Sequence, residues 1–180
     1  HLHDQENPFI ELLDEILGIF RRYDTVLSLG NTARGGGIHD GWGPAQQEEL
    51  RRNCALGRYA REQGIQVIIE GAGGHVRYNR IAPLVRSYKK AAPYPLFVAG
   101  PLPTDIALGY DHIAGCAGAA AASAAGADYI CSISPSEHLG LPGPDQVKEG
   151  LIAFRIAAHI GDIVKYGKDA ADKEISLLRS

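Results

Sequence analysis

The sequence predicts an α/β protein built around a parallel sheet. Helical and extended patterns alternate along its 180 residues, and the extended segments are apolar on both faces. Strands of this kind are typical of parallel sheets that helices cover. Polar residues are sparse within the strands and dense at one end of each, where parallel α/β folds bind ligands. The pattern favours either a doubly wound sheet or a (β/α)8 barrel, of which four strands make half.

Each element has its own signal. Segment 8–22 carries apolar residues at three- and four-residue steps, with Pro8 near its first turn, which predicts an amphipathic helix. Segment 44–63 repeats that period and is followed by Gly64, a residue that suits a helix C-terminus. The helix expected at 110–127 is rich in small residues and can pack closely against a neighbour. The other expected elements are helices at 76–91 and 145–167 and strands at 25–30, 65–70, 95–99 and 128–134.

Composition and charge exclude several classes of function. The 18 basic and 21 acidic residues give a net charge of −3, which argues against a nucleic-acid partner. No apolar run reaches the ~18 residues of a membrane span, and no secretory signal is visible. Cys54, Cys116 and Cys131 are widely spaced, which is typical of a reducing, cytoplasmic setting and excludes a thiolate metal site built from neighbours. The sequence contains no methionine, and hence no initiator methionine, which indicates that it is processed, truncated or incompletely recorded.

Candidate functional residues follow the four predicted strands. Because the carboxyl ends of parallel strands meet at one edge of a sheet, we expect these residues to share a site. They are Asn31, Thr32 and Arg34 after the first strand, Glu70 and His75 after the second, Thr104, Asp105, Tyr110, Asp111 and His112 after the third, and Glu137 and His138 after the fourth.

Several of these residues allow two interpretations. His75 and His138, with a carboxylate and water, would suit zinc or another divalent metal, but two loop histidines hydrogen-bonded to the backbone would give the same sequence. The loop GNTARGGG, with Arg34, could form an anion-binding nest or a flexible connector. Glu70 ends an apolar strand, where a carboxylate is costly unless it is paired or functional. His112 could carry a proton near neutral pH or could be a structural residue at a helix N-terminus.

Four strings of residues together resemble the ThiC family of radical S-adenosylmethionine enzymes. They are EGAGGHV, GPLPTDIALGYDHI, CSISPSEHLGLP and VKEGLIAFRIAAH, and the resemblance runs from about Glu6 to Lys165. It implies a parallel (β/α)8 TIM-type barrel, of which this chain would be the C-terminal half. Residues 1–166 would form the partial barrel of a catalytic domain, and residues 167–180 a charged tail that leads to a C-terminal cluster-binding segment.

The resemblance also implies an activity. Members of the family rearrange aminoimidazole ribotide with a radical made from S-adenosylmethionine at a [4Fe–4S] cluster. One branch makes the hydroxymethylpyrimidine phosphate of thiamine, and another makes 5-hydroxybenzimidazole, the lower ligand of a cobalamin. The family's CxxCxxxxC cluster motif does not occur in this sequence and is expected on a segment outside it. A cytoplasmic and homodimeric enzyme, with a small-molecule substrate and no nucleic-acid or membrane partner, is implied.

Single residues match the family by their place in these strings. Glu70 matches a substrate contact, Arg34 matches the arginine of a substrate loop, and His75 and His138 match the two ligands of zinc or another divalent metal. One glycine is inserted here, so that five positions rather than four separate Glu70 from His75. The expected substrate-binding residues are Asn31, Thr32, Ala33, Arg34, Glu70 and Phe97. The catalytic candidates are Glu70, Asp105 and His112, the last two by position alone.

Three departures from the family favour one of its branches. Asn31 replaces an aspartate, Ala33 a leucine and Phe97 a tyrosine, and such changes alter polarity where substrate is expected. They favour 5-hydroxybenzimidazole synthesis over pyrimidine synthesis. Two further hypotheses stay open. One ignores the resemblance and assigns a metal-dependent hydrolase or aldolase that uses the same glutamate and histidine pair; the other is a non-catalytic binding or assembly module that kept the half-barrel and lost the cluster.

Overall fold

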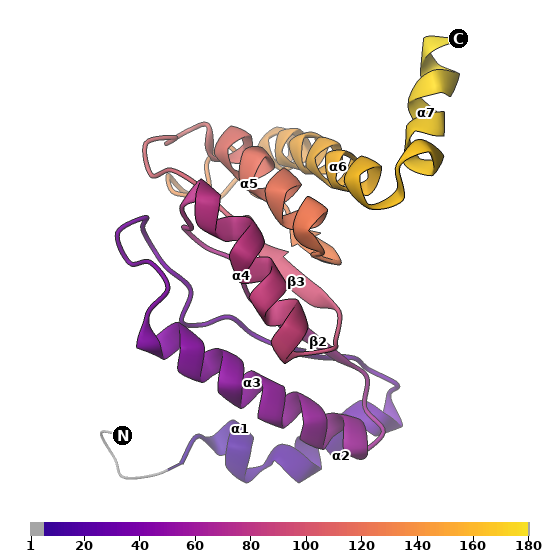
Figure 1. The fold of residues 1–180 in the computed structure, drawn as a ribbon. Helices are drawn as coiled ribbons and strands as arrows, with labels where there is room; N and C mark the ends of the chain where they lie inside the picture. Colours follow the sequence, from indigo (N-terminus) through magenta and orange to yellow (C-terminus); the bar gives the residue numbers. More distant parts are fainter. Residues whose placement is uncertain (1–5, 180) are drawn as a thin grey trace.

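A single parallel sheet organises the chain (Figure 1). The computed structural model describes residues 6–179. Its strands are β1 (Leu27–Leu29), β2 (Val67–Glu70), β3 (Leu96–Ala99) and β4 (Tyr129–Cys131), paired in parallel in the order β1-β2-β3-β4. The helices are α1 (Pro8–Glu11), α2 (Leu13–Arg22), α3 (Pro44–Glu62), α4 (Tyr78–Ala91), α5 (Asp111–Ala125), α6 (Pro144–Tyr166) and α7 (Lys168–Leu178). The predicted alternation of helices with parallel strands is confirmed.

The strand order bears on the choice between the two expected architectures. Each strand pairs with the next strand of the chain, so the order never reverses. A doubly wound sheet reverses at a switch point and carries helices on both faces. Here residues of α3, α4 and α5 all join one apolar cluster with the buried residues of β2 and β3. The α/β class is confirmed, and the arrangement is compatible with part of a (β/α) barrel.

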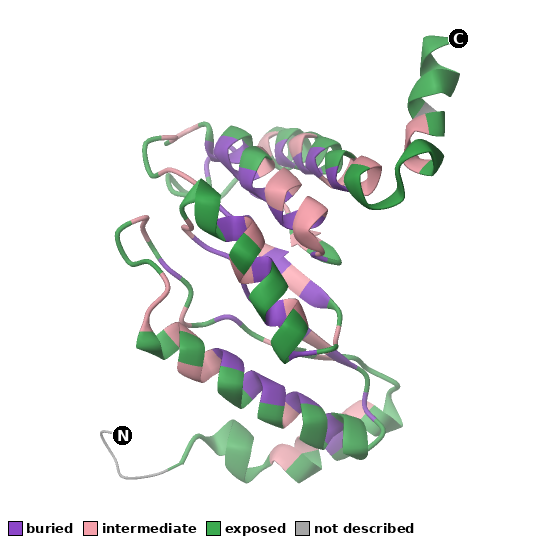
Figure 2. Ribbon diagram, in the orientation of Figure 1, coloured by how far each residue is buried: buried purple, intermediate pink, exposed green. Residues whose placement is uncertain are grey.

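Buried and intermediate residues alternate along the central strands, as Figure 2 shows for β3, so the two faces of the sheet differ in burial. Val67, Ile69, Leu96 and Val98 alternate along β2 and β3, are buried, and pack against the helices. The described residues leave the opposite face partly open, so the cover expected on both faces is present on one. We call this open face the inner face, because it corresponds to the interior of a barrel; its residues include Ile68, Glu70, Phe97, Ala99, Tyr129 and Cys131.

Small residues let α5 and α6 approach each other and the sheet closely. A Cβ atom added at Gly118 would collide with the backbone carbonyl of Pro101, and one at Gly161 would collide with Ser123. At Gly150 an added Cβ would lie 2.5 Å from the carbonyl oxygen of Ile133. The close packing expected of the small-residue helix is therefore confirmed.

The two ends of the chain differ in detail from expectation. The helix expected at 8–22 is divided into α1 and α2 because Leu12, with φ −99° and ψ 17°, leaves helical geometry. At the other end Gly167, with φ +60°, separates α6 from α7, which extends away from the rest of the fold (Figure 1). The division into 1–166 and 167–180 stays a prediction, and residues 1–5 and Ser180 lie outside the described part. Within residues 6–179, no helix is both long and apolar enough to cross a membrane.

Candidate functional site

Two imidazoles meet at the carboxyl edge of the sheet. His75 follows β2 and His138 follows β4, and their Nε2 atoms lie 3.1 Å apart. The ring centroids are 4.9 Å apart and the planes cross at 67°. The structure thus brings together the two histidines that the sequence separates most widely among the candidates.

A carboxylate stands behind each ring. Asp105 Oδ1 lies 2.7 Å from Nδ1 of His75, and Asp111 Oδ1 lies 3.1 Å from Nδ1 of His138. Asp111 also accepts the backbone N–H of His138 at 3.2 Å, and it is buried at the first turn of α5. These contacts assign the hydrogen of each neutral ring to Nδ1 and leave a lone pair on each Nε2.

The facing lone pairs provide a test of fit for a metal ion. Two unprotonated nitrogens 3.1 Å apart repel each other unless a cation or a proton lies between them. A tetrahedral zinc ion with Zn–N bonds of about 2.0–2.1 Å places two nitrogen ligands about 3.3 Å apart, close to this spacing. The described residues contain no group of three or more His, Cys, Asp or Glu side chains suited to a metal. The expected carboxylate therefore lies behind the rings, and the pair offers two protein ligands.

The glycine-rich turn after β2 positions His75. Ala72 and Gly74 have positive φ values of 53° and 78°, and a Cβ at Gly73 would lie 2.7 Å from the backbone nitrogen of Ala99. Gly74 bridges to Gly35, and the N–H of His75 donates to the Gly35 carbonyl at 3.0 Å. The segment with the inserted glycine is thus a tight turn that side chains would obstruct.

Glu70 and Arg34 converge on the backbone of Asn31. Glu70 Oε2 accepts the N–H of Asn31 at 3.1 Å, and the Arg34 guanidinium donates to the Asn31 carbonyl at 2.9 Å. Asn31 is buried, whereas Thr32 is exposed. Four of the expected substrate residues, 31–34, therefore lie in one short loop, which a fifth, the strand-end glutamate, contacts.

Sequence reasoning missed two residues of α3 that hold this loop. Glu49 accepts the side-chain amide of Asn31 at 2.6 Å and the N–H of Ala33 at 2.9 Å. Asn53 donates to the carbonyl of Gly30 at 2.9 Å. Asn53 could have been found, because it is a polar residue on the buried stripe of α3. Glu49 carries no comparable signal.

Two glycines of the loop, Gly36 and Gly37, direct their N–H groups to a carboxylate of the protein. The N–H groups of Gly36 and Gly37 donate to Asp40 Oδ2 at 2.7 and 2.9 Å, and the N–H of Ile38 donates to Asp105. The Ile38 hydrogen bond, followed by the contact with His75, holds the pKa of Asp105 below its usual value. In this conformation carboxylates of the protein occupy the nest that the sequence suggested.

The inner face of the sheet continues the site. Phe97 lies beside Glu70 in the strand register, and its ring meets Tyr129 edge-on with centroids 6.4 Å apart. Desolvation raises the pKa of the Cys131 thiol, the carboxylates of Glu70 and Glu137 raise it further, and Arg34 lowers it. Charged groups from three strand ends thus act on one thiol of the inner face, which sequence reasoning had not placed in the site.

His112 points elsewhere. Its Nε2 lies 3.3 Å from Glu149 of α6, and its buried Nδ1 has no hydrogen-bond partner among the described residues. Asp111 faces His138, and the next residue of the same helix turns about 100° further, toward α6. The structure does not bring His112 to the imidazole pair, and its catalytic role stays a prediction.

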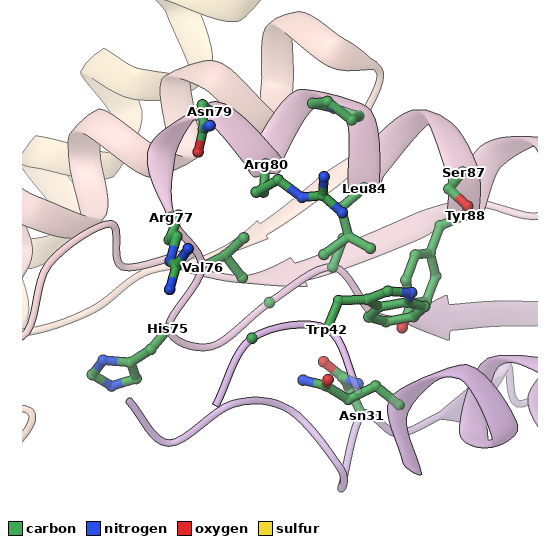
Figure 3. Close-up of a pocket in the computed structure, with 15 residues that line it drawn as sticks. Asn31, Trp42, His75, Val76, Arg77, Asn79, Arg80, Leu84, Ser87 and Tyr88 are labelled. Atoms are coloured by element: carbon green, nitrogen blue, oxygen red, sulfur yellow. The ribbon is translucent and has the colours of Figure 1, made fainter. Parts of the chain in front are cut away.

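A cavity of about 570 Å³ adjoins the site at His75 (Figure 3). It lies between α4 and the segment that leads into α3, with Arg77, Arg80 and Trp42 among its lining residues and His75 at its edge. Trp42 packs edge-on against the buried Tyr88 with centroids 5.7 Å apart. Trp42 therefore anchors the loop before α3.

Fold and site together define a class: an α/β protein compatible with part of a (β/α) barrel, whose sheet edge gathers two imidazoles, their carboxylates and the loop of Arg34. Comparison with known proteins assigns the family. Residues 1–180 match the family described as Radical SAM ThiC family, and the chain belongs to it. The resemblance drawn from the four strings is confirmed.

Relatives with two different names match the chain. It is 48% identical over 180 residues to a phosphomethylpyrimidine synthase of Ignicoccus hospitalis, a match that covers 98% of this chain and 40% of that protein. A phosphomethylpyrimidine synthase of Sulfurisphaera tokodaii is 49% identical over 167 residues, covering 92% and 39%. A 5-hydroxybenzimidazole synthase of Geobacter sulfurreducens is 45% identical over 180 residues, covering 97% and 41%. The chain spans about two fifths of the length of these relatives.

Proposed function

We propose that this chain forms the metal- and substrate-binding half of a radical S-adenosylmethionine enzyme that rearranges aminoimidazole ribotide. The observation that carries the proposal is the imidazole pair, with Nε2 atoms 3.1 Å apart and a carboxylate behind each ring. Family membership supports the class of reaction. A homodimer and a cytoplasmic location stay predictions.

The residues of the site have distinct tasks in this proposal. A zinc ion held by His75 and His138 would supply a positive charge and exchangeable positions for oxygen or nitrogen groups of a ligand. Glu70, on the inner face, accepts hydrogen bonds from ligand N–H or O–H groups as it does from Asn31. Arg34 has N–H groups beyond the one on Asn31 and offers them to an anionic group. Phe97 supplies an apolar wall.

The cysteines of this chain do not suit an iron–sulfur cluster. All three are free, with Cys54 buried, Cys116 half-buried and Cys131 exposed on the inner face. Thiolate clusters need cysteines that converge on one point, usually from a closely spaced motif. We therefore assign the [4Fe–4S] cluster and the S-adenosylmethionine chemistry to a part of the protein outside this chain.

Within the family we propose 5-hydroxybenzimidazole as the product. Both relatives' names occur at similar identity, 48% and 45%, so identity does not discriminate between them. The proposal rests on three departures from the family. Asn31 and Ala33 in the loop replace an aspartate and a leucine, and Phe97 on the inner face replaces a tyrosine, so the polarity of these positions differs from that of the family. The full-length protein, incubated anaerobically with aminoimidazole ribotide and S-adenosylmethionine, is expected to release 5-hydroxybenzimidazole, identified by mass spectrometry. A pyrimidine phosphate as sole product would contradict this assignment.

The metal site is tested by elemental analysis. We expect about one zinc per chain in the full-length protein prepared anaerobically, and loss of that zinc in His138→Ala, because one imidazole cannot retain it. His159→Ala is the matched control, since His159 lies on α6, away from the imidazole pair, and its ring lies 3.2 Å from Glu174. Full zinc content in His138→Ala would overturn the proposed site.

A further inference from the structure

The carboxylate of Asp105 is shared between His75 and the loop that follows β1. Its Oδ1 lies 2.7 Å from Nδ1 of His75. The N–H of Ile38 donates to both oxygens of the same carboxylate, at 3.1 Å to Oδ1 and 2.8 Å to Oδ2. Asp105 follows β3, so one side chain joins segments that follow three different strands.

Asp111 provides a contrast within the same site. Among the described residues, Asp111 makes both of its polar side-chain contacts with His138, one to Nδ1 and one to the backbone N–H. It stands behind a ring as Asp105 does, but it does not touch the loop. Each carboxylate therefore orients one imidazole, and of the two only Asp105 also contacts the loop that follows β1.

The loop itself is anchored at both ends. Glu49 holds its beginning through Asn31 and Ala33, and Asp40 closes its tip through the N–H groups of Gly36 and Gly37. Between these anchors, the backbone of His75 bonds Gly35 and its side chain reaches Ile38 through Asp105. The middle of the loop thus depends on the position of His75.

We propose that Asp105 is a positioning residue that couples metal binding at the imidazole pair to ordering of residues 35–40. This inference rests on the proposed metal site. A cation on Nε2 makes the Nδ1–H a stronger donor, which holds the Asp105 carboxylate in place and thereby the Ile38 N–H. Coupling between binding events is reciprocal, so the ordered loop in turn strengthens metal binding.

Hydrogen exchange of the loop with and without zinc tests the coupling in the full-length protein. We expect zinc to slow amide exchange at residues 35–40 in the wild type. Asp105→Ala should abolish this effect of zinc and lower zinc affinity about 10–100-fold, the usual cost of losing such a partner. Asp105→Asn keeps one acceptor oxygen and replaces the other by a donor, so it should lose less zinc affinity while still releasing Ile38.

Two matched variants distinguish zinc-dependent ordering of residues 35–40 from a general loosening of that loop. Asp111→Asn should lower zinc affinity but, at saturating zinc, retain the slowing of loop exchange. Asp40→Asn should speed loop exchange with and without zinc but keep the zinc-dependent difference at Ile38. Zinc binding to the wild type without any change in loop exchange would overturn the coupling alone. Failure of the wild type to bind zinc would overturn the metal site and the coupling with it.

Discussion

Glu49 shows how much of the site depends on one side chain outside it. Its two carboxylate oxygens accept one donor each, the Asn31 amide at 2.6 Å and the Ala33 N–H at 2.9 Å. Asn31 is only 3% exposed, so water could not easily replace its hydrogen bond to Glu49 if that bond were removed. The conformation of the loop that carries Arg34 therefore depends on a carboxylate whose two oxygens must each accept a hydrogen bond.

Replacing Glu49 by glutamine tests this reading of the loop. An amide offers one acceptor and turns a donor toward a donor, so we expect a local cost of about 1–3 kcal/mol and faster amide exchange at residues 31–34. Hydrogen exchange with mass spectrometry measures the effect. Glu48→Gln is the control, because Glu48 pairs with Arg51 and Arg52 on the exposed side of α3. Equal loosening in both variants would contradict the role of Glu49.

At the scale of elements, glycines determine how α5 lies against its neighbours. Gly118 of α5 touches the backbone of Pro101, Gly150 of α6 the backbone after β4, and Gly161 of α6 the side chain of Ser123 on α5. Backbone atoms cannot move aside as a flexible side chain can. The first turn of α5 carries Asp111, so the seating of this helix also places the carboxylate behind His138.

A pair of glycine substitutions separates packing from helix propensity. Gly118→Ala should lower the free energy of unfolding by about 1–3 kcal/mol or more, because the added methyl meets the Pro101 carbonyl. Gly18→Ala should raise it by up to about 1 kcal/mol, because nothing lies within 4 Å of that Cβ in α2 and alanine favours the helix. Urea denaturation measures the free energy of unfolding of both variants. A stabilising Gly118→Ala would contradict the close packing.

The whole molecule leaves one face and two edges of its sheet uncovered among the described residues. β1 and β4 each pair on one side only, and Tyr129 on the inner face is 59% exposed. Open strand edges and apolar faces favour association with another chain or segment. In a complete barrel, further strands would cover this face.

The 180-residue chain, expressed alone, is therefore expected to self-associate. Tyr129→Lys should reduce the association, because it places a charge on the inner face. Tyr78→Lys is the control, since Tyr78 is similarly exposed, at 60%, but lies at the start of α4 away from that face. Sedimentation velocity measures the mass distribution. A monodisperse monomer of the unmodified chain would count against the prediction.

The sequence by itself determined the class of fold, the approximate position of each strand and the family, although β4 (Tyr129–Cys131) is shorter than the strand expected at 128–134. Those features depend on local periodicity and on the topology of parallel strands, which brings His75, His138 and Glu70 to one edge wherever the loops run. It also predicted the close packing of the small-residue helix at 110–127.

Only the tertiary structure decided which neighbours complete the site. It placed Asp105 and Asp111 behind the two rings, Glu49 beneath the loop, and His112 against α6. Asp111 and His112 are adjacent in the sequence, and the sequence favoured His112 as the catalytic candidate. They point to different neighbours because of the rotation of α5 about its axis, and tertiary contacts with Pro101 and α6, which no local sequence pattern specifies, set that rotation.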